Sequence, residues 1–288
     1  MTLRHVLLAA VTAWAAFLAA GSAHATIICS ITSARGFTSV YDPISTVPND
    51  NVSSVSINCS RVSGDPGTTT YSLAVTNGLY PNGQNNRARY LTNNYIKYDV
   101  YKDAAYSSRW GASGGSPITG TLNFGSGTSA SLTLPYYNRV GALQSAVVGD
   151  YTDTMTTTLT YSVTSVLNAT ATPAPMPVTI TTNPQCQFST PPGTMSLSYT
   201  SFQATAATGS TQFATRCTSG LPYTMSLGAT SGTLMGLNYS LSLSAASGTG
   251  TGAAQTYSVN GSIAANQVGV CATSACAASA PQTITISY

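Results

Sequence analysis

The side chains with the clearest capacity for chemistry are cysteines. Thiolates can hold a metal ion, act as nucleophiles or join as disulfides. The chain has six of them, and an even number behind an export signal favours disulfides. Their spacing suggests three successive pairs, 30, 31 and 5 residues apart: Cys29 with Cys59, Cys186 with Cys217, and Cys271 with Cys276. We expect these three disulfides, with a cysteine-only metal site as the competing interpretation.

Residue types suited to catalysis are scarce. The chain has no Glu, and its two His residues, His5 and His24, lie within the first 25 residues. General acid–base catalysis usually needs His, Glu, Asp or Lys at a tuned pKa. Ser–His–Asp and Cys–His arrangements are therefore excluded further along the chain, and Ser–Lys chemistry would depend on Lys97 or Lys102. We expect a protein that is not an enzyme and holds no cofactor.

The N-terminal segment has the pattern of an export signal. "MTLR" supplies positive charge, "HVLLAAVTAWAAFLAAG" is apolar, and "AHA" at residues 23–25 fits a cleavage site before Thr26. The alternative is a membrane anchor, because the apolar run is close to the length that spans a bilayer. No later stretch is as apolar. We therefore expect a signal peptide over residues 1–25, export, and no membrane span after cleavage.

The remaining chain is weakly charged. Cleavage leaves 263 residues, enough for two domains of ordinary size. Loss of Arg4 leaves nine basic residues against seven Asp, a formal net charge of +2, and Arg216 is the only charged side chain after Asp153. This charge is too small and too dispersed for a typical nucleic-acid footprint, so we expect no nucleic-acid partner.

The chain contains an internal repeat. Aligning the two long-range cysteine pairs brings five further positions into register: Tyr71 with Tyr223, Tyr98 with Tyr239, Val140 with Ile263, Gln144 with Gln267, and Tyr161 with Tyr288. Both copies consist of short alternating segments, such as "YSLAVT" and "MTTTLTYSV", separated by Gly, Asn, Pro and Ser. No segment after residue 25 has a convincing helical period. This pattern predicts two β-sandwiches in tandem.

Copy one also resembles a known family, the spore coat protein U domain of archaic chaperone–usher pilins. The resemblance rests on "YIKYDVYKDAAYSSRWG" (95–111), "NRVGALQ" (138–144), a Gly-x-Tyr-x-Asp at 149–153, and the closing "TTTLTYSV" (156–163). Copy two keeps its cysteine pair, "GSIAANQ" and the closing strand, but lacks the Trp-Gly and Gly-x-Tyr-x-Asp motifs. The resemblance places Tyr98 and Trp110 in the core and makes Asp150 and Asp153 part of a structural turn.

The family resemblance implies an all-β fold of two tandem immunoglobulin-like sandwiches, of which the C-terminal one lacks its final strand. In such pilins a periplasmic chaperone fills the gap, and the N-terminal extension of the adjacent subunit then replaces it, by β-strand addition at an outer-membrane usher. We expect an N-terminal domain over 26–166, a Pro-rich linker over 167–183, and a C-terminal domain over 184–288. The linker segment 177–182, "PVTITT", could complete copy one or begin copy two.

The two ends of the secreted chain suggest a position in a pilus. Only Thr26, Ile27 and Ile28 precede Cys29, too few for a donor strand. The last seven residues, "QTITISY", alternate like a strand that should pair with a partner, so Ile284, Ile286 and Tyr288 are expected to border the acceptor groove. We therefore expect a tip adhesin that is exported through the periplasm to the cell surface of a Gram-negative bacterium.

The resemblance also implies a role in attachment and biofilm formation on an abiotic or host surface. Apolar residues in copy-one loops are candidates for the adhesive surface: Leu79, Tyr80 and Pro81; Ala146, Val147 and Val148; Ile44 and Val47. Alternatively, each loop is tucked under the edge of the sandwich. The charged and aromatic segment 87–110 could instead bind carbohydrate. A second function remains open, a structural coat or surface-layer protein with self-complete domains.

Overall fold

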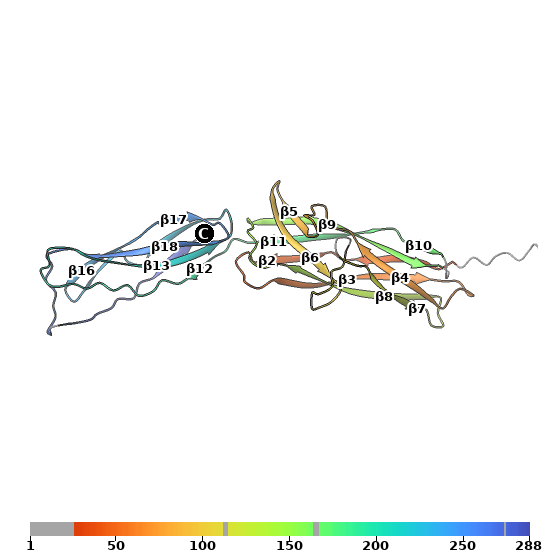
Figure 1. Ribbon diagram of the computed structural model, residues 1–288, viewed down its shortest axis with the longest axis horizontal. Coiled ribbons are helices and arrows are strands. Elements are labelled where there is room, and N and C mark those ends of the chain that lie inside the picture. Colours follow the sequence, from red (N-terminus) through yellow and green to blue (C-terminus); the bar gives the residue numbers. More distant parts are fainter. Residues whose placement is uncertain (1–25, 112–114, 164–166, 274) are drawn as a thin grey trace, which may run out of the picture.

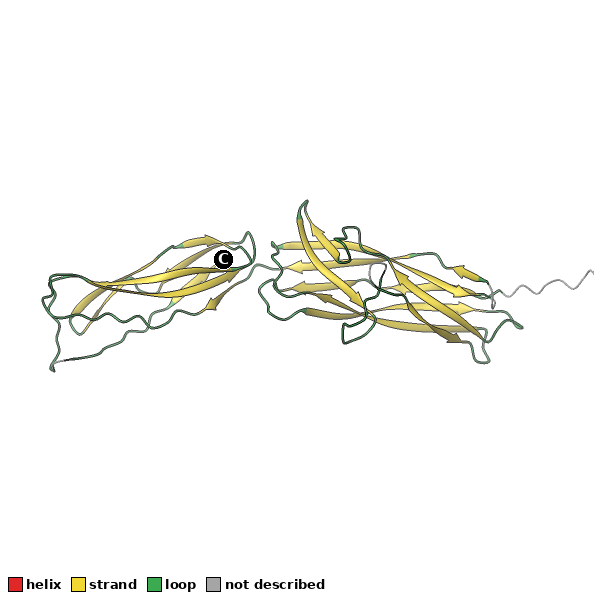
Figure 2. Ribbon diagram, viewed as in Figure 1, coloured by secondary structure: helices red, strands yellow, loops and turns green. Residues whose placement is uncertain are grey.

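The computed structural model describes residues 26–111, 115–163, 167–273 and 275–288, and the expected signal peptide lies outside these ranges. The regular elements of the described residues are β-strands (Figure 2). Within the same ranges, no helix has the length and apolarity needed to cross a membrane. The chain is therefore an all-β protein, as the sequence predicts.

The strands form two elongated bodies that lie end to end (Figure 1). The first body holds one connected sheet with a main path β1-β3-β8-β6-β5-β9-β11-β2. Its strands are β1 (Ile28–Ala34), β2 (Phe37–Tyr41), β3 (Asn49–Ser60), β4 (Thr68–Val75), β5 (Asn86–Tyr90), β6 (Asn94–Tyr101), β7 (Ile118–Asn123), β8 (Ser129–Val140), β9 (Gly149–Ser162), β10 (Asn168–Thr170) and β11 (Ala174–Thr182).

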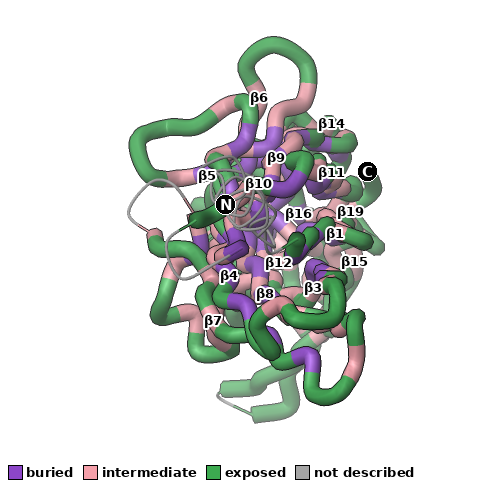
Figure 3. The backbone as a smooth tube through the Cα atoms, turned by 90° about the vertical axis from the view of Figure 1, so that its right-hand side faces the viewer, coloured by how far each residue is buried: buried purple, intermediate pink, exposed green. Residues whose placement is uncertain are grey.

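The second body has two sheets, β12-β13-β18-β16-β15 and β17-β14-β19. Its strands are β12 (Cys186–Thr190), β13 (Ala207–Cys217), β14 (Pro222–Leu227), β15 (Ser231–Leu234), β16 (Leu237–Leu243), β17 (Ser247–Thr249), β18 (Ala254–Ile263) and β19 (Ile284–Ser287). Strand alternation places one set of side chains inside each body and the other in solvent. Viewed along the long axis, the buried residues gather in the interior (Figure 3).

The two bodies repeat one strand plan. β1, β3, β4, β5, β6, β7, β8 and β9 correspond in order and pairing to β12 through β19. Tyr98 pairs with Val140 between β6 and β8, and Tyr239 pairs with Ile263 between β16 and β18, so the aligned positions share one register. β2, β10 and β11 have no strand counterpart in the described part of the second body.

The repeat extends to a side-chain clamp. The Gln144 side chain accepts a hydrogen bond from the Lys97 N–H and donates one to the Lys97 carbonyl, both at 2.8 Å. The Gln267 side chain does the same at Asn238, at 2.8 and 2.9 Å. The alignment of these two glutamines therefore identified a shared element, the clamp of the loop that follows β8 or β18.

The segment 177–182 belongs to the sheet of the first body. It forms most of β11, which runs antiparallel to β9, with Val178 opposite Asp153, and parallel to β2, with Val178 opposite Phe37. The inward residues Met176, Val178 and Ile180 are at most 1% exposed. β11 thus fills the position between β9 and β2 and supplies three apolar side chains to the first core.

The three disulfides join the pairs expected from the sequence. Cys29 and Cys59 face each other between β1 and β3, and Cys186 and Cys217 face each other between β12 and β13. All six cysteines are used. The third bridge closes a short exposed loop between Cys271 and Cys276.

The bodies touch through the loop between β8 and β9. The Ser219 N–H donates a hydrogen bond to the Ala146 carbonyl at 3.1 Å, and Val147 forms a parallel bridge with Ser219. The Ser145 hydroxyl donates to the Thr251 carbonyl at 3.4 Å. This end of the first body is therefore its junction with the second body.

Candidate functional site

The second body has an unpaired strand edge. β19 pairs with β14, and within the described residues nothing pairs with its other edge. Ile284 and Ile286 are partly buried against the second core, and Tyr288 is 59% exposed. An edge of free N–H and C=O groups beside partly exposed apolar side chains can accept an added strand.

The corresponding edge of the first body is covered. Met155, Thr157 and Leu159 of β9 are fully buried, and β11 and β10 pair along the strand. The difference also shows in length, because β9 has 14 residues whereas β19 has four.

In the first body β11 lies between β9 and β2, and the counterpart of β2 in the described part of the second body is also unpaired. Gln267 donates its backbone N–H to the Tyr199 hydroxyl at 2.8 Å, just as Gln144 donates to the Tyr41 hydroxyl at 2.8 Å. Tyr199 therefore occupies the position of Tyr41, and the segment before it corresponds to β2. Residues 191–200 form no strand, and Met195 is only half-buried. The sequence alignment missed this correspondence because the two segments share little beyond alternation and the tyrosine.

In the first body, Leu79 and Pro81 are exposed on the loop between β4 and β5, with Leu79 at 64%, while Tyr80 is half-buried. The side chain of Asp153 holds this loop by hydrogen bonds. Its carboxylate accepts hydrogen bonds from the Leu79 N–H and the Tyr98 hydroxyl, both at 2.7 Å. The loop is therefore held by a buried carboxylate on β9, and Asp153 has a structural role in fixing where Leu79 lies.

Burial is the main cause of a raised pKa at Tyr98, and the Asp153 carboxylate raises that pKa further. The phenol therefore stays protonated and donates to Asp153 across the physiological pH range. Tyr98 and Trp110 are both core residues, at 1% and 2% exposed, as the family resemblance implies. The Trp110 indole donates to the Leu73 carbonyl at 2.8 Å.

The loop containing Val147 and Val148 is not a freely exposed adhesive loop. Val147 packs against the first core and touches the second body at Ser219, Ala146 is 3% exposed, and Val148 is 38% exposed. The prediction of an exposed adhesive loop is wrong here, because the end of β8 and the start of β9 both lie at the junction with the second body. A local apolar pattern does not reveal this position. Ile44 is likewise buried at 5%, whereas Val47 of the same loop is 67% exposed.

The opposite end of the first body lies away from the second body (Figure 1). It carries the β3–β4 loop, the β7–β8 loop and the start of β10. Val62 is 54% exposed and Leu167 is 57% exposed there. Neither residue forms a clear sequence pattern, because each is a single apolar side chain among polar neighbours.

The segment 87–110 forms a cationic and aromatic face around the β5–β6 ribbon, which projects from the body in Figure 3. The Arg87 guanidinium lies 4.1 Å from the Tyr95 ring centroid, and the Arg89 guanidinium lies 4.0 Å from the Tyr80 ring centroid. Tyr80 therefore connects the exposed 79–81 loop to this face.

The sequence profile of the Spore Coat Protein U domain matches residues 13–158. The match covers half of the chain. The chain belongs to the Spore Coat Protein U domain family. The match ends within β9 of the first body, so the family relationship of the second body stays a prediction.

No curated protein matches the chain. Among solved structures, a chain of the CsuC–CsuE chaperone–tip adhesion subunit complex from archaic chaperone-usher Csu pili of Acinetobacter baumannii is 14% identical, with a TM-score of 0.45, and the likeness covers 90% of this chain and 99% of that chain. The CupB6 tip adhesin of Pseudomonas aeruginosa is 10% identical, with a TM-score of 0.37 and coverage of 90% and 93%. CfaE, the adhesive subunit of the CFA/I fimbria of enterotoxigenic Escherichia coli, is 10% identical, with a TM-score of 0.36 and coverage of 55% and 49%.

Proposed function

We propose that this Spore Coat Protein U domain protein is a non-enzymatic subunit at the tip of an archaic chaperone–usher pilus. The observation that carries the proposal is the contrast between the two bodies. The first body has β11 between β9 and β2, whereas the equivalent position in the described second body has no strand. A periplasmic chaperone, and then an adjacent pilin subunit delivered at the outer-membrane usher, would supply that strand.

The first body gives the direction of the added strand. β11 is antiparallel to β9, so a strand at β19 in the same arrangement would run antiparallel to β19. β19 runs toward the junction, because Ser287 pairs with Thr224 near the β14–β17 end that contacts the first body. The added strand would therefore leave the second body at the end opposite the junction.

That direction fits a terminal subunit. The donor's own body would follow at the end of the second body that is away from the first body, and the first body would point outward. The same end exposes Phe202, Val268 and Val270, each more than half exposed. Backbone hydrogen bonds from Phe202 to Gln267 and from Val270 to Met235 bring these loops together. A neighbouring subunit at this end would cover apolar side chains as well as the open edge.

The outward position of the first body suggests attachment to an abiotic or host surface and a role in biofilm formation. Among the exposed apolar residues of the first body are the 79–81 loop on its side and Val62 with Leu167 at its free end. Exposed apolar side chains on a rigid sandwich suit contact with a hydrophobic surface.

Strand addition is tested by producing residues 26–288 in a bacterial periplasm with and without the cognate periplasmic chaperone. We expect a soluble one-to-one complex with the chaperone and aggregation or proteolysis without it. Ile286→Asp should abolish the complex, since it places a charge on the apolar face that the chaperone strand covers, whereas the outward-facing Thr285→Asp should not. A chain that is equally soluble, monomeric and protease-resistant alone would instead favour the self-complete coat or surface-layer protein.

Attachment is tested on assembled pili with two separate sets of changes. One set is Leu79→Ser with Pro81→Ser, and the other is Val62→Ser with Leu167→Ser. We expect adhesion to polystyrene to fall in at least one set while the number of pili stays constant. Unchanged adhesion in both sets and in their combination would exclude these residues as the attachment surface.

A further inference from the structure

The outer face of the β5–β6 ribbon carries an unfavourable charge arrangement. Arg87 and Lys97 are directly opposite each other on neighbouring strands, and Arg89 is opposite Tyr95. These side chains point outward, because Ala88 and Ile96 between them are fully buried. Two like charges directly opposite in an antiparallel pair destabilise the sheet. A chain with only ten Lys and Arg residues therefore places two of them where their charges repel each other.

Carboxylates do not neutralise this face. The ion pairs of the described residues are Arg109 with Asp99 and Arg139 with Asp50. Lys97 and Arg89 have no carboxylate within ion-pair distance, and the side chains of both make no hydrogen bond within the described ranges. Their charged groups are therefore available to a ligand.

The surplus charge of the secreted chain is concentrated here. Five cations lie on or border this face, namely Arg87, Arg89, Lys97, Arg109 and Arg139, against the two acids Asp50 and Asp99, a local surplus of three. The other four cations of residues 26–288 are outnumbered by five Asp. The face is thus positive while the rest of the secreted chain is slightly negative.

The cations are held in place by aromatic rings. Arg87 stacks on Tyr95 and donates a hydrogen bond to the Tyr80 carbonyl at 2.8 Å, while Arg89 stacks on Tyr80. The two tyrosine rings lie 6.3 Å apart. Stacking fixes each guanidinium plane. The edge of Arg87 is partly used by the carbonyls of Tyr80 and Pro81, whereas the edge of Arg89 stays open, which is the geometry that binds carboxylate or sulfate groups.

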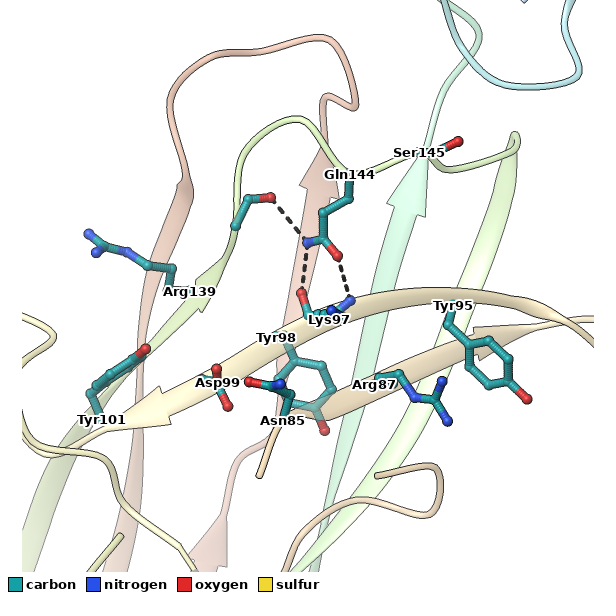
Figure 4. A pocket seen from close by; sticks show the side chains of 11 residues that line it. Asn85, Arg87, Tyr95, Lys97, Tyr98, Asp99, Tyr101, Arg139, Gln144 and Ser145 are labelled. Carbon is teal, nitrogen blue, oxygen red and sulfur yellow. Dashed lines mark hydrogen bonds between the residues drawn. The ribbon is translucent and has the colours of Figure 1, made fainter. Parts of the chain in front are cut away.

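A shallow open cleft of about 550 Å³ is lined by Arg87, Tyr95 and Lys97, and Arg89 lies outside its lining, two residues farther along β5. Figure 4 shows Arg87, Tyr95 and Lys97 along the two strands, with Asn85 and Asp99 farther along the same face. The Gln144 side chain holds the backbone of Lys97 from the other side. The cleft therefore combines cations, aromatic rings and amides on a rigid ribbon.

We propose that this face binds an acidic polysaccharide through its carboxylate or sulfate groups. Lys97 in the cleft and Arg89 farther along β5 contact the anionic groups. A polysaccharide fits better than a nucleic acid, because the face has a surplus of only three charges and the guanidinium groups already cover the ring faces on which bases would stack. This interaction differs in kind from attachment through apolar loops.

Binding of the full secreted chain is measured against immobilised alginate, which carries carboxylates, and dextran sulfate, with uncharged dextran as the neutral control. The double variant Arg89→Gln with Lys97→Gln should bind at least about tenfold more weakly, because hydrogen bonds to charged groups exceed those between neutral groups. The matched control is Arg35→Gln with Arg216→Gln, which removes the same charge outside this face and should change affinity less than about twofold.

Comparison of alginate with dextran sulfate identifies which anionic group is preferred. Thermal unfolding of each double variant verifies that the first body is intact. An equal loss of affinity in the two double variants would mean that binding depends only on net charge, and would overturn the proposal. Tighter binding of a single-stranded oligonucleotide, or binding to uncharged dextran that survives the Arg89 and Lys97 changes, would overturn it as well.

Discussion

The two bodies are built from the same eight strands, yet their cores differ in how well they are closed. In the first body, Phe37 and Tyr41 on β2 and Leu159 on β9 are almost fully buried. In the second body, the corresponding Met195, Tyr199 and Ile286 are half-buried. The difference follows from a single element, because β11 lies between the two strands that carry the first set. One strand therefore decides whether this plan forms a closed sandwich.

The physical effect of that strand has two parts. β11 pairs its backbone with β9 over nine positions and with β2 over five. It also buries Met176, Val178 and Ile180, each of which stabilises the core by about 1.5–3 kcal/mol relative to an exposed side chain. The second body lacks both contributions in the described residues. The comparison predicts that removing β11 from the first body, or adding its equivalent to the second, should interchange their properties.

The largest effect is expected from disabling β11 itself. The triple variant Met176→Ser, Val178→Ser and Ile180→Ser removes three buried apolar side chains, at about 2–5 kcal/mol each for large-to-small changes. That sum exceeds the stability of a typical domain, so the first body should unfold. Trp110 is the only tryptophan of residues 26–288 and lies in the first core, so in a chain that starts at Thr26 its fluorescence reports this body alone.

The matched control for this variant is Pro177→Ser with Thr179→Ser. These residues lie on the same strand but point away from the core. Native-like Trp110 fluorescence in the triple variant would show that the first body does not depend on the side chains of β11.

The second-largest effect is expected from the reverse change, which adds a strand to the second body. A Gly-rich linker and a copy of residues 174–182 are fused after Tyr288. The copied strand should protect the backbone amides of β19 and of residues 275–283 from hydrogen exchange, and should raise the unfolding temperature of the second body. The expected gain is up to about 1.5–3 kcal/mol for each of three buried side chains, less the cost of ordering the strand.

A fused strand with Asp in place of Val178 and Ile180 serves as the control for this gain. Equal protection by the two fused strands would mean that the groove does not select alternating apolar side chains, which contradicts a complementation site.

Several features were accessible from the sequence because they depend on residue type and spacing alone. The cysteine pairs, the strand alternation and the Gln144–Gln267 correspondence all follow from such local or periodic patterns. The position of a loop in space is different, because it depends on which strand ends lie together. Val147 and Leu79 occur in similar apolar loops, but only Val147 is at the junction. The stacking of Arg89 on Tyr80 likewise joins residues from separate loops and strands.

A smaller difference between the bodies should appear at alkaline pH. Burial raises the pKa of Tyr136 to about 12 and, together with Asp153, raises the pKa of Tyr98 further. The folded state favours the neutral phenol, so this stability is present below the unfolded pKa of about 10 and is lost as pH rises above it. Each such tyrosine should cost the first body about 1.4 kcal/mol per pH unit between its unfolded and folded pKa values.

The second body has a raised tyrosine pKa at Tyr257, to about 12, caused by burial and then by Tyr223. Between pH 8 and pH 11 the free energy of unfolding should therefore fall more for the first body than for the second. Trp110 fluorescence reports the unfolding of the first body. Tyr98→Phe should flatten the pH dependence of the first body, while lowering its stability near neutral pH because Asp153 loses a hydrogen-bond donor. A first body whose stability is constant to pH 11 would contradict this assignment.

The smallest effect is expected where the bodies are most alike, at the glutamine clamp. Gln144→Ala and Gln267→Ala each remove the bonds to one backbone N–H and two carbonyls, so each should cost about 1 kcal/mol. Hydrogen exchange of the Lys97 and Asn238 amides should accelerate by similar factors, about fivefold, while Gln212→Ala, on an exposed side chain, leaves both unchanged. Equal factors would mean that the clamp acts independently of the final strand. A much faster exchange at Asn238 in the unchanged chain would instead mean that the open groove loosens the whole second body, and adding the fused strand should then restore the rate found at Lys97.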